Sequence, residues 1–160
     1  MVKRELASGI VNDSIFLGIR FGMGNKDFSN HCRILNNKQI LVEGLGFTAQ
    51  YQLHLKQEAA MDFYPNFYEG KIYEMPTDFY YKGWNPTHPS LQSDSLMEEV
   101  RSLCETWYRT KFIKMYSPQN KLIYASVQGN RQLLIYVKDV KSVRLMISDL
   151  RVKQKISNEK

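Results

Sequence analysis

Apolar and other residues alternate from Ser14 to Phe21, which predicts a short strand with one apolar face. Gly22 and Gly24 follow, and glycine allows backbone angles that are closed to other residues. Asn25 is a good helix cap, so a helix is expected to begin there. The apolar stripe of this helix consists of Phe28, Cys32 and Leu35.

Strand-like runs fill the middle of the chain. Residues 40–46 and 47–55 are the first two, and the aromatic segment 61–81 follows, with turns expected at Pro65-Asn66 and Glu69-Gly70. The segment 82–92, "KGWNPTHPSLQ", contains one glycine and two prolines, which predicts a loop without regular structure.

A second helix is expected to begin at Asp94 or Ser95. Its apolar stripe consists of Leu96, Val100, Leu103, Cys104 and Trp107. Four strands should complete the chain, at Lys111–Tyr116, Lys121–Gln128, Gln132–Val137 and Ser142–Leu150. Short turns separate these strands, which predicts an antiparallel meander.

Both halves therefore run from a helix into strands. A shift of 72 residues places the first apolar stripe on Val100, Cys104 and Trp107, and places Tyr51, Leu53 and Leu55 on Ile123, Ala125 and Val127. Two amphipathic patterns can match by chance, so the shift leaves open whether the halves 14–82 and 94–150 are structural repeats. The predicted fold is α+β, an antiparallel sheet with helices on one face, in a single domain over residues 1–150.

The positive charge is concentrated near the end of the chain. Of the net charge of +6, residues 138–160 contribute +4, whereas the remainder is nearly neutral. We predict a basic, flexible tail at residues 151–160, because chain ends are commonly disordered. A nucleic-acid-binding surface would spread its charge over a face, so nucleic acid is not the expected partner.

The sequence leaves the compartment open. No apolar run approaches the roughly 18 residues that a membrane-spanning helix requires. The start of the chain lacks the continuous apolar core of a signal peptide. The protein is expected in the cytoplasm if Met1 is the native start, and in the cell envelope or outside the cell if an export signal has been removed.

The segment "FLGIRFGMGNKDF" resembles a motif of small bacterial envelope proteins. It is similar to a pattern in the outer-membrane assembly lipoprotein domain called BamE or SmpA/OmlA, and to one in the β-lactamase-inhibitor protein. Gly22, Met23, Asp27 and Phe28 match this motif, whereas Gly24 replaces its usual Ser or Thr. The resemblance covers about 20 residues. It implies a non-enzymatic fold that is used for protein contacts, with no catalytic residue at the motif.

The reactive residue types form no catalytic or metal-binding pattern. Cys32 and Cys104 could form a disulfide if their helices pack together, but buried free thiols are the preferred interpretation. The histidines lack ligand spacing, so we predict no metal site and no cofactor. They are His31, His54 and His88.

The richest source of candidate contact residues is the aromatic segment from Phe63 to Trp84. Tyr80 and Tyr81 are adjacent, so in a strand they face opposite sides and one of them should be exposed. Trp84 lies in the loop, as either a plug on the core or a contact residue. The candidate partner-binding residues are Tyr64, Tyr68, Tyr81 and Trp84. The alternative is that these rings belong to the core and to cross-strand pairs.

These observations predict a non-catalytic binding or accessory protein that contacts a protein partner through its sheet face and the loop 76–92. One alternative is a small enzyme with a cleft that pairs His54 or His88 with carboxylates. Another is weak nucleic-acid binding through the basic tail. The partner and the oligomeric state are not specified by the sequence.

Overall fold

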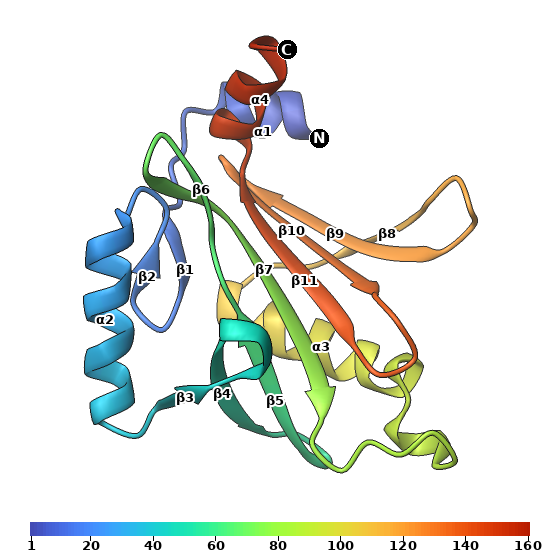
Figure 1. Cartoon of the computed structure of the whole chain (residues 1–160). Coiled ribbons are helices and arrows are strands. Elements are labelled where there is room, and N and C mark those ends of the chain that lie inside the picture. Colours follow the sequence, from blue (N-terminus) through green and yellow to red (C-terminus); the bar gives the residue numbers. More distant parts are fainter.

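The computed structural model describes residues 1–160, apart from the side chain of Leu45, and it confirms the α+β fold class (Figure 1). The helices are α1 (Val2–Ala7), α2 (Asn25–Asn37), α3 (Ser93–Tyr108) and α4 (Leu150–Asn158), with the short 3-10 helices η1 (Leu45–Phe47) and η2 (Pro89–Leu91). The strands of the first half are β1 (Ser14–Phe16), β2 (Ile19–Arg20), β3 (Leu41–Glu43), β4 (Ala49–His54), β5 (Glu58–Phe63), β6 (Asn66–Tyr68) and β7 (Lys71–Tyr81). Those of the second half are β8 (Ile113–Tyr116), β9 (Leu122–Gln128), β10 (Arg131–Val137) and β11 (Val143–Asp149).

One antiparallel sheet organises the fold, in the order β3-β4-β5-β7-β11-β10-β9-β8, with β6 paired to β7. Strands β8 to β11 form the predicted meander. The last strands of the two halves, β7 and β11, pair at the centre. The sheet therefore ends at two edge strands, β3 and β8.

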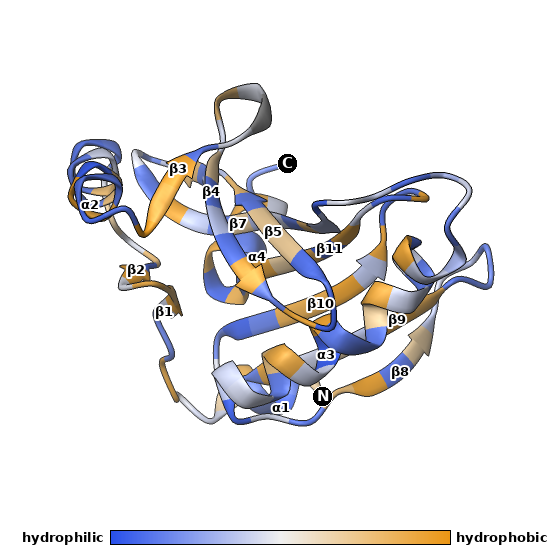
Figure 2. Cartoon of the chain, turned by 90° about the horizontal axis from the view of Figure 1, so that it is seen from below, coloured by the Kyte–Doolittle hydropathy of each residue, from blue (hydrophilic) through white to orange (hydrophobic). Residues whose placement is uncertain are grey.

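The core lies between the sheet and α3, which runs along one face of β7, β11 and β10 (Figures 1 and 2). Leu96 and Val100 of α3 and Leu145 and Ile147 of β11 are all fully buried and belong to the same core. The side of the sheet that faces α3 is called the inner face below, and the opposite side the outer face. Helix α2 lies beside β3, and α1 and α4 lie near one end of the sheet (Figure 1).

The predicted alignment of the two halves is wrong for their strands. Residues that pair across an antiparallel sheet share a face. Tyr51 of β4 pairs with Met61 of β5, and when the pairing is followed strand by strand through β7, β11 and β10 to β9, Tyr51 lies on the same face as Tyr124. Tyr124 hydrogen-bonds to Glu98 of α3, so this face is the inner one. Ile123 therefore faces outward, because neighbouring residues of a strand point to opposite faces. A shift of 72 residues thus pairs inner with outer positions.

Residues 151–160 form no flexible tail, which corrects the prediction, since helix α4 includes most of them. Asp149 caps this helix by accepting a hydrogen bond from the backbone of Arg151. Lys153 and Lys155 form ion pairs with Glu74 and Glu69 of the sheet region, at 3.1 and 3.5 Å. The lysines that suggested a solvated tail thus attach the helix to the body.

The turn before α2 requires glycine only at Gly22, whose φ of 88° lies in the left-handed region. Gly24 has an extended backbone and occupies the N-cap position, so Asn25 is the first helical residue rather than the predicted cap. Met23 packs against the core, and its sulfur accepts a hydrogen bond from the backbone N–H of Arg20.

The loop begins after Tyr81, as the prediction for residues 82–92 has it, but the partner-contacting loop was placed at 76–92, and its first residues belong to β7, which continues through Pro76. Proline is rare inside a sheet because it has no N–H to donate. Pro76 is tolerated here because it pairs with Met146 of β11 on one side, while on the other side it lies between the end of β5 and the start of β6.

Candidate functional site

The structure separates the four predicted contact residues and places Tyr81 in the core and Trp84 against it. Tyr81 is only 2% exposed, on the inner face, where its hydroxyl donates a hydrogen bond to Glu99 of α3. Burial and this hydrogen bond raise the pKa of Tyr81. Tyr81 is thus a core residue and not a contact residue, and it is the neighbouring Tyr80 that points to the outer face.

Trp84 packs against the core and is partly buried. Its Nε1 is buried and finds no hydrogen-bond partner among the described residues. Of the two predicted roles, a plug on the core agrees with this position.

Tyr64 is 48% exposed and makes an edge-to-face contact with Phe28 of α2, with ring centroids 6.1 Å apart. It lies immediately after β5. It remains an accessible aromatic side chain beside the outer face.

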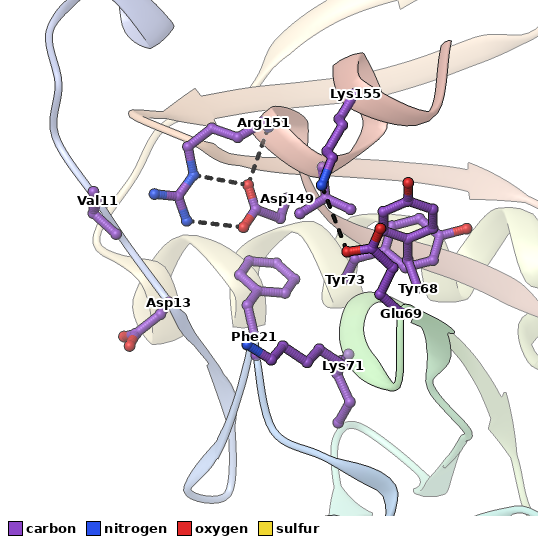
Figure 3. Close-up of a pocket in the computed structure, with 13 residues that line it drawn as sticks. Val11, Asp13, Phe21, Tyr68, Glu69, Lys71, Tyr73, Asp149, Arg151 and Lys155 are labelled. Carbon is purple, nitrogen blue, oxygen red and sulfur yellow. Dashed lines mark hydrogen bonds and ion pairs between the residues drawn. The ribbon is translucent and has the colours of Figure 1, made fainter. Parts of the chain in front are cut away.

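Tyr68 borders a cavity of about 350 Å³ between the β6–β7 turn, α4 and the segment before β1 (Figure 3). Its hydroxyl donates to the carboxylate of Glu159, and this hydrogen bond, with a smaller effect of burial, raises the pKa of Tyr68 to about 12. Lys155 lies over the Tyr68 ring, 5.6 Å from its centroid. The ring is therefore engaged by α4 of the same chain.

The charges around this cavity largely neutralise one another (Figure 3). Arg151 forms hydrogen bonds to both carboxylate oxygens of Asp149, at 3.2 and 2.9 Å, and Lys155 pairs with Glu69. Lys71 and Asp13 also line the cavity and contribute one charge of each sign, so the lining carries little net positive charge for an anion.

The cysteines and histidines do not form a reactive centre within the described residues. Both cysteines are free, and burial raises the pKa of Cys32 to about 11 and also raises that of Cys104. His54 contacts Glu58 at the surface, and His88 contacts Ser90. No group of three or more potential metal ligands occurs among the described residues.

The outer face of the sheet divides into two halves of different character. Over β4, β5 and β7 the half is polar: Gln50 and Tyr80 both donate hydrogen bonds to the carboxylate of Asp62. At the border with the other half, Asp78 accepts two hydrogen bonds from Arg144, at 2.7 and 3.0 Å, and one from Lys138 at 2.7 Å. The carboxylates of this polar half therefore already have hydrogen-bond partners within the chain.

Over β8 to β10 the outer face is mainly apolar, and this surface extends to Met146 of β11 and Pro76 of β7. Residues that pair directly across an antiparallel sheet share a face, so the register defines rows of neighbours across the strands. One row consists of Ile113, Ala125, Leu134, Met146 and Pro76. A second row begins with Met115, Ile123 and Tyr136. These eight residues are called the apolar half-face below.

The apolar half-face is exposed most at its edge. Ile113 and Met115 of β8 are 49% and 46% exposed, and the next strands contribute the half-buried Ile123, Leu134 and Met146. A sheet that is covered on one side by helices is expected to be polar on the other. An exposed, contiguous apolar surface is instead typical of an interaction site.

Strand β8 also presents a free backbone edge, since it pairs with β9 alone. Edge strands are commonly protected from new pairing by charged side chains or proline. In β8 the only charged residue is Lys114, which pairs with Tyr124 and therefore points to the inner face. The outer side of this edge has no charge to protect it.

The apolar half-face was not predicted from the sequence, although the sequence contains a signal for it. In β10 the residues Leu133 to Tyr136 are apolar without alternation, which is typical of a strand with two apolar faces. Attention to aromatic residues favoured the segment 63–84 instead. Ile113 and Met115 could not be placed on one face with Leu134 before the pairing register was known.

The comparisons with known proteins add no relative to this picture. No family model, no curated protein and no solved structure matches the chain. Among the described helices, none has the length and apolar character needed to cross a membrane.

Proposed function

We propose that this chain is a non-catalytic protein-binding module that docks a partner on the apolar half-face and along β8. The observation that carries the proposal is the continuity of two apolar rows with an exposed edge strand. Such an edge can accept a further strand through backbone hydrogen bonds, while side-chain positions on each face determine which strand fits.

The register defines the chemistry of the strand that would fit. Side chains on the outer face of an added strand would lie beside Ile113 and Met115, and apolar residues suit this position. Side chains on its inner face would lie beside Lys114. An acidic residue is favoured there, because opposite charges on neighbouring strands attract.

The surrounding charge supports the same partner. Lys121 and Lys114 have no ion-pair partner among the described residues, whereas Lys111, just before β8, pairs with Glu105 at 3.3 Å. The whole chain carries +6, so a second copy would be repelled and an acidic partner attracted. The proposed partner is therefore a protein with an extended segment of alternating apolar and acidic residues.

A seven-residue peptide of alternating valine and glutamate tests this proposal by NMR titration of the isotope-labelled full chain. We expect saturable shifts at the backbone amides of β8 and β9. A peptide with lysine in place of glutamate should bind about fivefold more weakly, because one exposed charge pair contributes up to about 1 kcal/mol.

Two matched variants locate the site. Met115→Glu places a charge in the apolar half-face and should abolish binding, whereas Gln52→Glu places the same charge on the outer face of β4 and should leave it unchanged. Lys114→Glu should reverse the preference between the two peptides. Equal binding by the Met115→Glu protein, or shifts confined to other strands, would contradict the proposal.

A further inference from the structure

The largest of the described cavities, about 640 Å³, lies on the other side of the β8–β9 hairpin, between this hairpin and the start of α3. Leu122, Val137 and Met97 give it an apolar lining, and each of them also packs against the core. This volume is within the range of about 300–1,000 Å³ that is typical of small-molecule sites. The cavity is called the hairpin cleft below.

One wall of the hairpin cleft is acidic. Asp94 and Glu98 are four residues apart on α3, so their side chains lie on the same face of the helix and both border the cleft. Glu98 is held in place, since it accepts a hydrogen bond from Tyr124 and another from Arg101 at 3.0 Å. The hydrogen bond from Tyr124 and the contact with Arg101 lower the pKa of Glu98, which keeps it ionised at neutral pH.

Asp94, in the first turn of α3, is the carboxylate of this wall that has no side-chain partner in the described part of the chain. Among the described residues its carboxylate has no ion-pair or hydrogen-bond partner, whereas Glu98 is already paired with Arg101. The opposite wall carries one cation, Lys121, together with the uncharged Ser117 and Gln119. An apolar cavity with a free carboxylate at its rim has one clear chemical complement, an apolar body that carries a cationic group.

We infer that the hairpin cleft binds a small organic cation, with its apolar part against Met97, Leu122 and Val137 and its ammonium group at Asp94. This site adjoins the proposed protein-docking surface, since Ile123 and Tyr136 of the apolar half-face also line the cleft. It is distinguished by Asp94 and Met97 of α3, whereas the docking surface uses the outer face and the backbone edge of β8. The apolar contacts would provide most of the affinity, and the charge at Asp94 would select amines over carboxylates.

A matched pair of probes, 4-phenylbutylamine and 4-phenylbutanoate, tests the inference, because the two share an apolar body and differ in charge. In an NMR titration of the full chain, the amine should give saturable shifts at the amides of residues 94–98 and 117–123. The carboxylate should bind at least about threefold more weakly, a ratio typical of one exposed ion pair.

Asp94→Asn should remove most of the preference for the amine, and Asp27→Asn, which changes the acidic residue in the first turn of α2, should leave it unchanged. Val137→Trp should fill the cleft and weaken both probes. If that variant fails to fold, the two exposed aspartate variants still decide the question. Absence of saturable shifts around the cleft, equal binding of the two probes, or an unchanged preference in Asp94→Asn would overturn the inference.

Met115→Glu separates this site from the docking surface. The inference predicts that this variant binds 4-phenylbutylamine as the unmodified chain does, even where it no longer binds the alternating peptide. Loss of amine binding in Met115→Glu would place the probe on the apolar half-face and would overturn the assignment to the cleft.

Discussion

One row of the outer face contains both kinds of surface side by side. From β8 to β10 the row consists of Met115, Ile123 and Tyr136, and from β11 to β5 it continues with Arg144, Asp78 and Asp62. The two parts lie on the same face of one sheet, the outer face, opposite the side that faces α3. They differ in how their side chains are satisfied.

The charged part finds its partners within the chain. Asp78 and Asp62 lie directly opposite each other, which alone would be unfavourable for two carboxylates. Arg144 and Lys138 compensate Asp78, and Tyr80 and Gln50 serve Asp62. The apolar part has no comparable cover among the described residues. Stability should therefore depend on the polar half, and binding on the apolar half-face.

The largest expected effect separates the two faces of one strand. Leu133 is fully buried, and its replacement by alanine should lower the free energy of unfolding by about 2–5 kcal/mol, the usual cost of a cavity in a core. The same change at the half-buried Leu134 should cost no more than about 1 kcal/mol. Urea denaturation of both variants measures this difference. Equal losses would mean that the outer face is covered after all.

The next effect concerns the polar half. Asp78→Ala leaves Arg144 and Lys138 without their carboxylate, so the free energy of unfolding should fall by about 1–3 kcal/mol. Glu43→Ala on the exposed edge strand β3 serves as the control and should change it by no more than about 0.5 kcal/mol. A neutral result for Asp78→Ala would show that this network contributes nothing to folding.

Acid should weaken the same network. Burial alone would raise the pKa of Asp78, but the hydrogen bonds and charges of Arg144 and Lys138 outweigh it and hold this pKa below its ordinary value of 3.8. The stabilisation is therefore complete above the unfolded-state pKa and is lost as the pH falls through the lower folded-state pKa. Below pH 4, Asp78→Asn should reduce the slope of stability against pH, and Leu134→Ala should keep the slope of the unmodified chain.

The smallest effect is expected at the exposed end of the polar half. His54 and Glu58 are 2.7 Å apart, but their side chains are 81% and 64% exposed. Such surface pairs usually contribute less than about 1 kcal/mol, so His54→Ala should lower the melting temperature only slightly. A loss as large as that of Asp78→Ala would contradict the ranking by exposure.

The sequence predicted the elements better than their mutual orientation. Strands β8 to β11 lie within about two residues of their expected bounds, because alternation and turn residues are local signals. Whether Tyr80 or Tyr81 faces the core depends on pairing with distant strands, and no local signal decides it. Helix α4 was missed because its lysines suggest a solvated tail, whereas their partners Glu69 and Glu74 lie about 80 residues earlier.

For the candidate surface, the sequence predicted a sheet face as the binding surface but not the residues that form it. A sheet face was expected to bind a partner, but Ile113, Met115 and Leu134 come from separate strands that only the register brings together. Of the predicted aromatic residues, Tyr64 lies beside the polar half of the outer face, Tyr68 contacts α4, and Tyr81 is buried. Side-chain composition alone could not separate these three environments.

Hydrogen exchange at the backbone amides of β8 tests the central proposal most directly. On addition of the peptide of alternating valine and glutamate, those backbone amides of Ile113–Tyr116 that point away from β9 should become protected from exchange, because an added strand would accept their hydrogen bonds. The amides of β3, the other edge strand, should exchange as before. Unchanged exchange in β8 at saturating peptide, or equal protection in the Met115→Glu protein, would contradict a docking site on this edge.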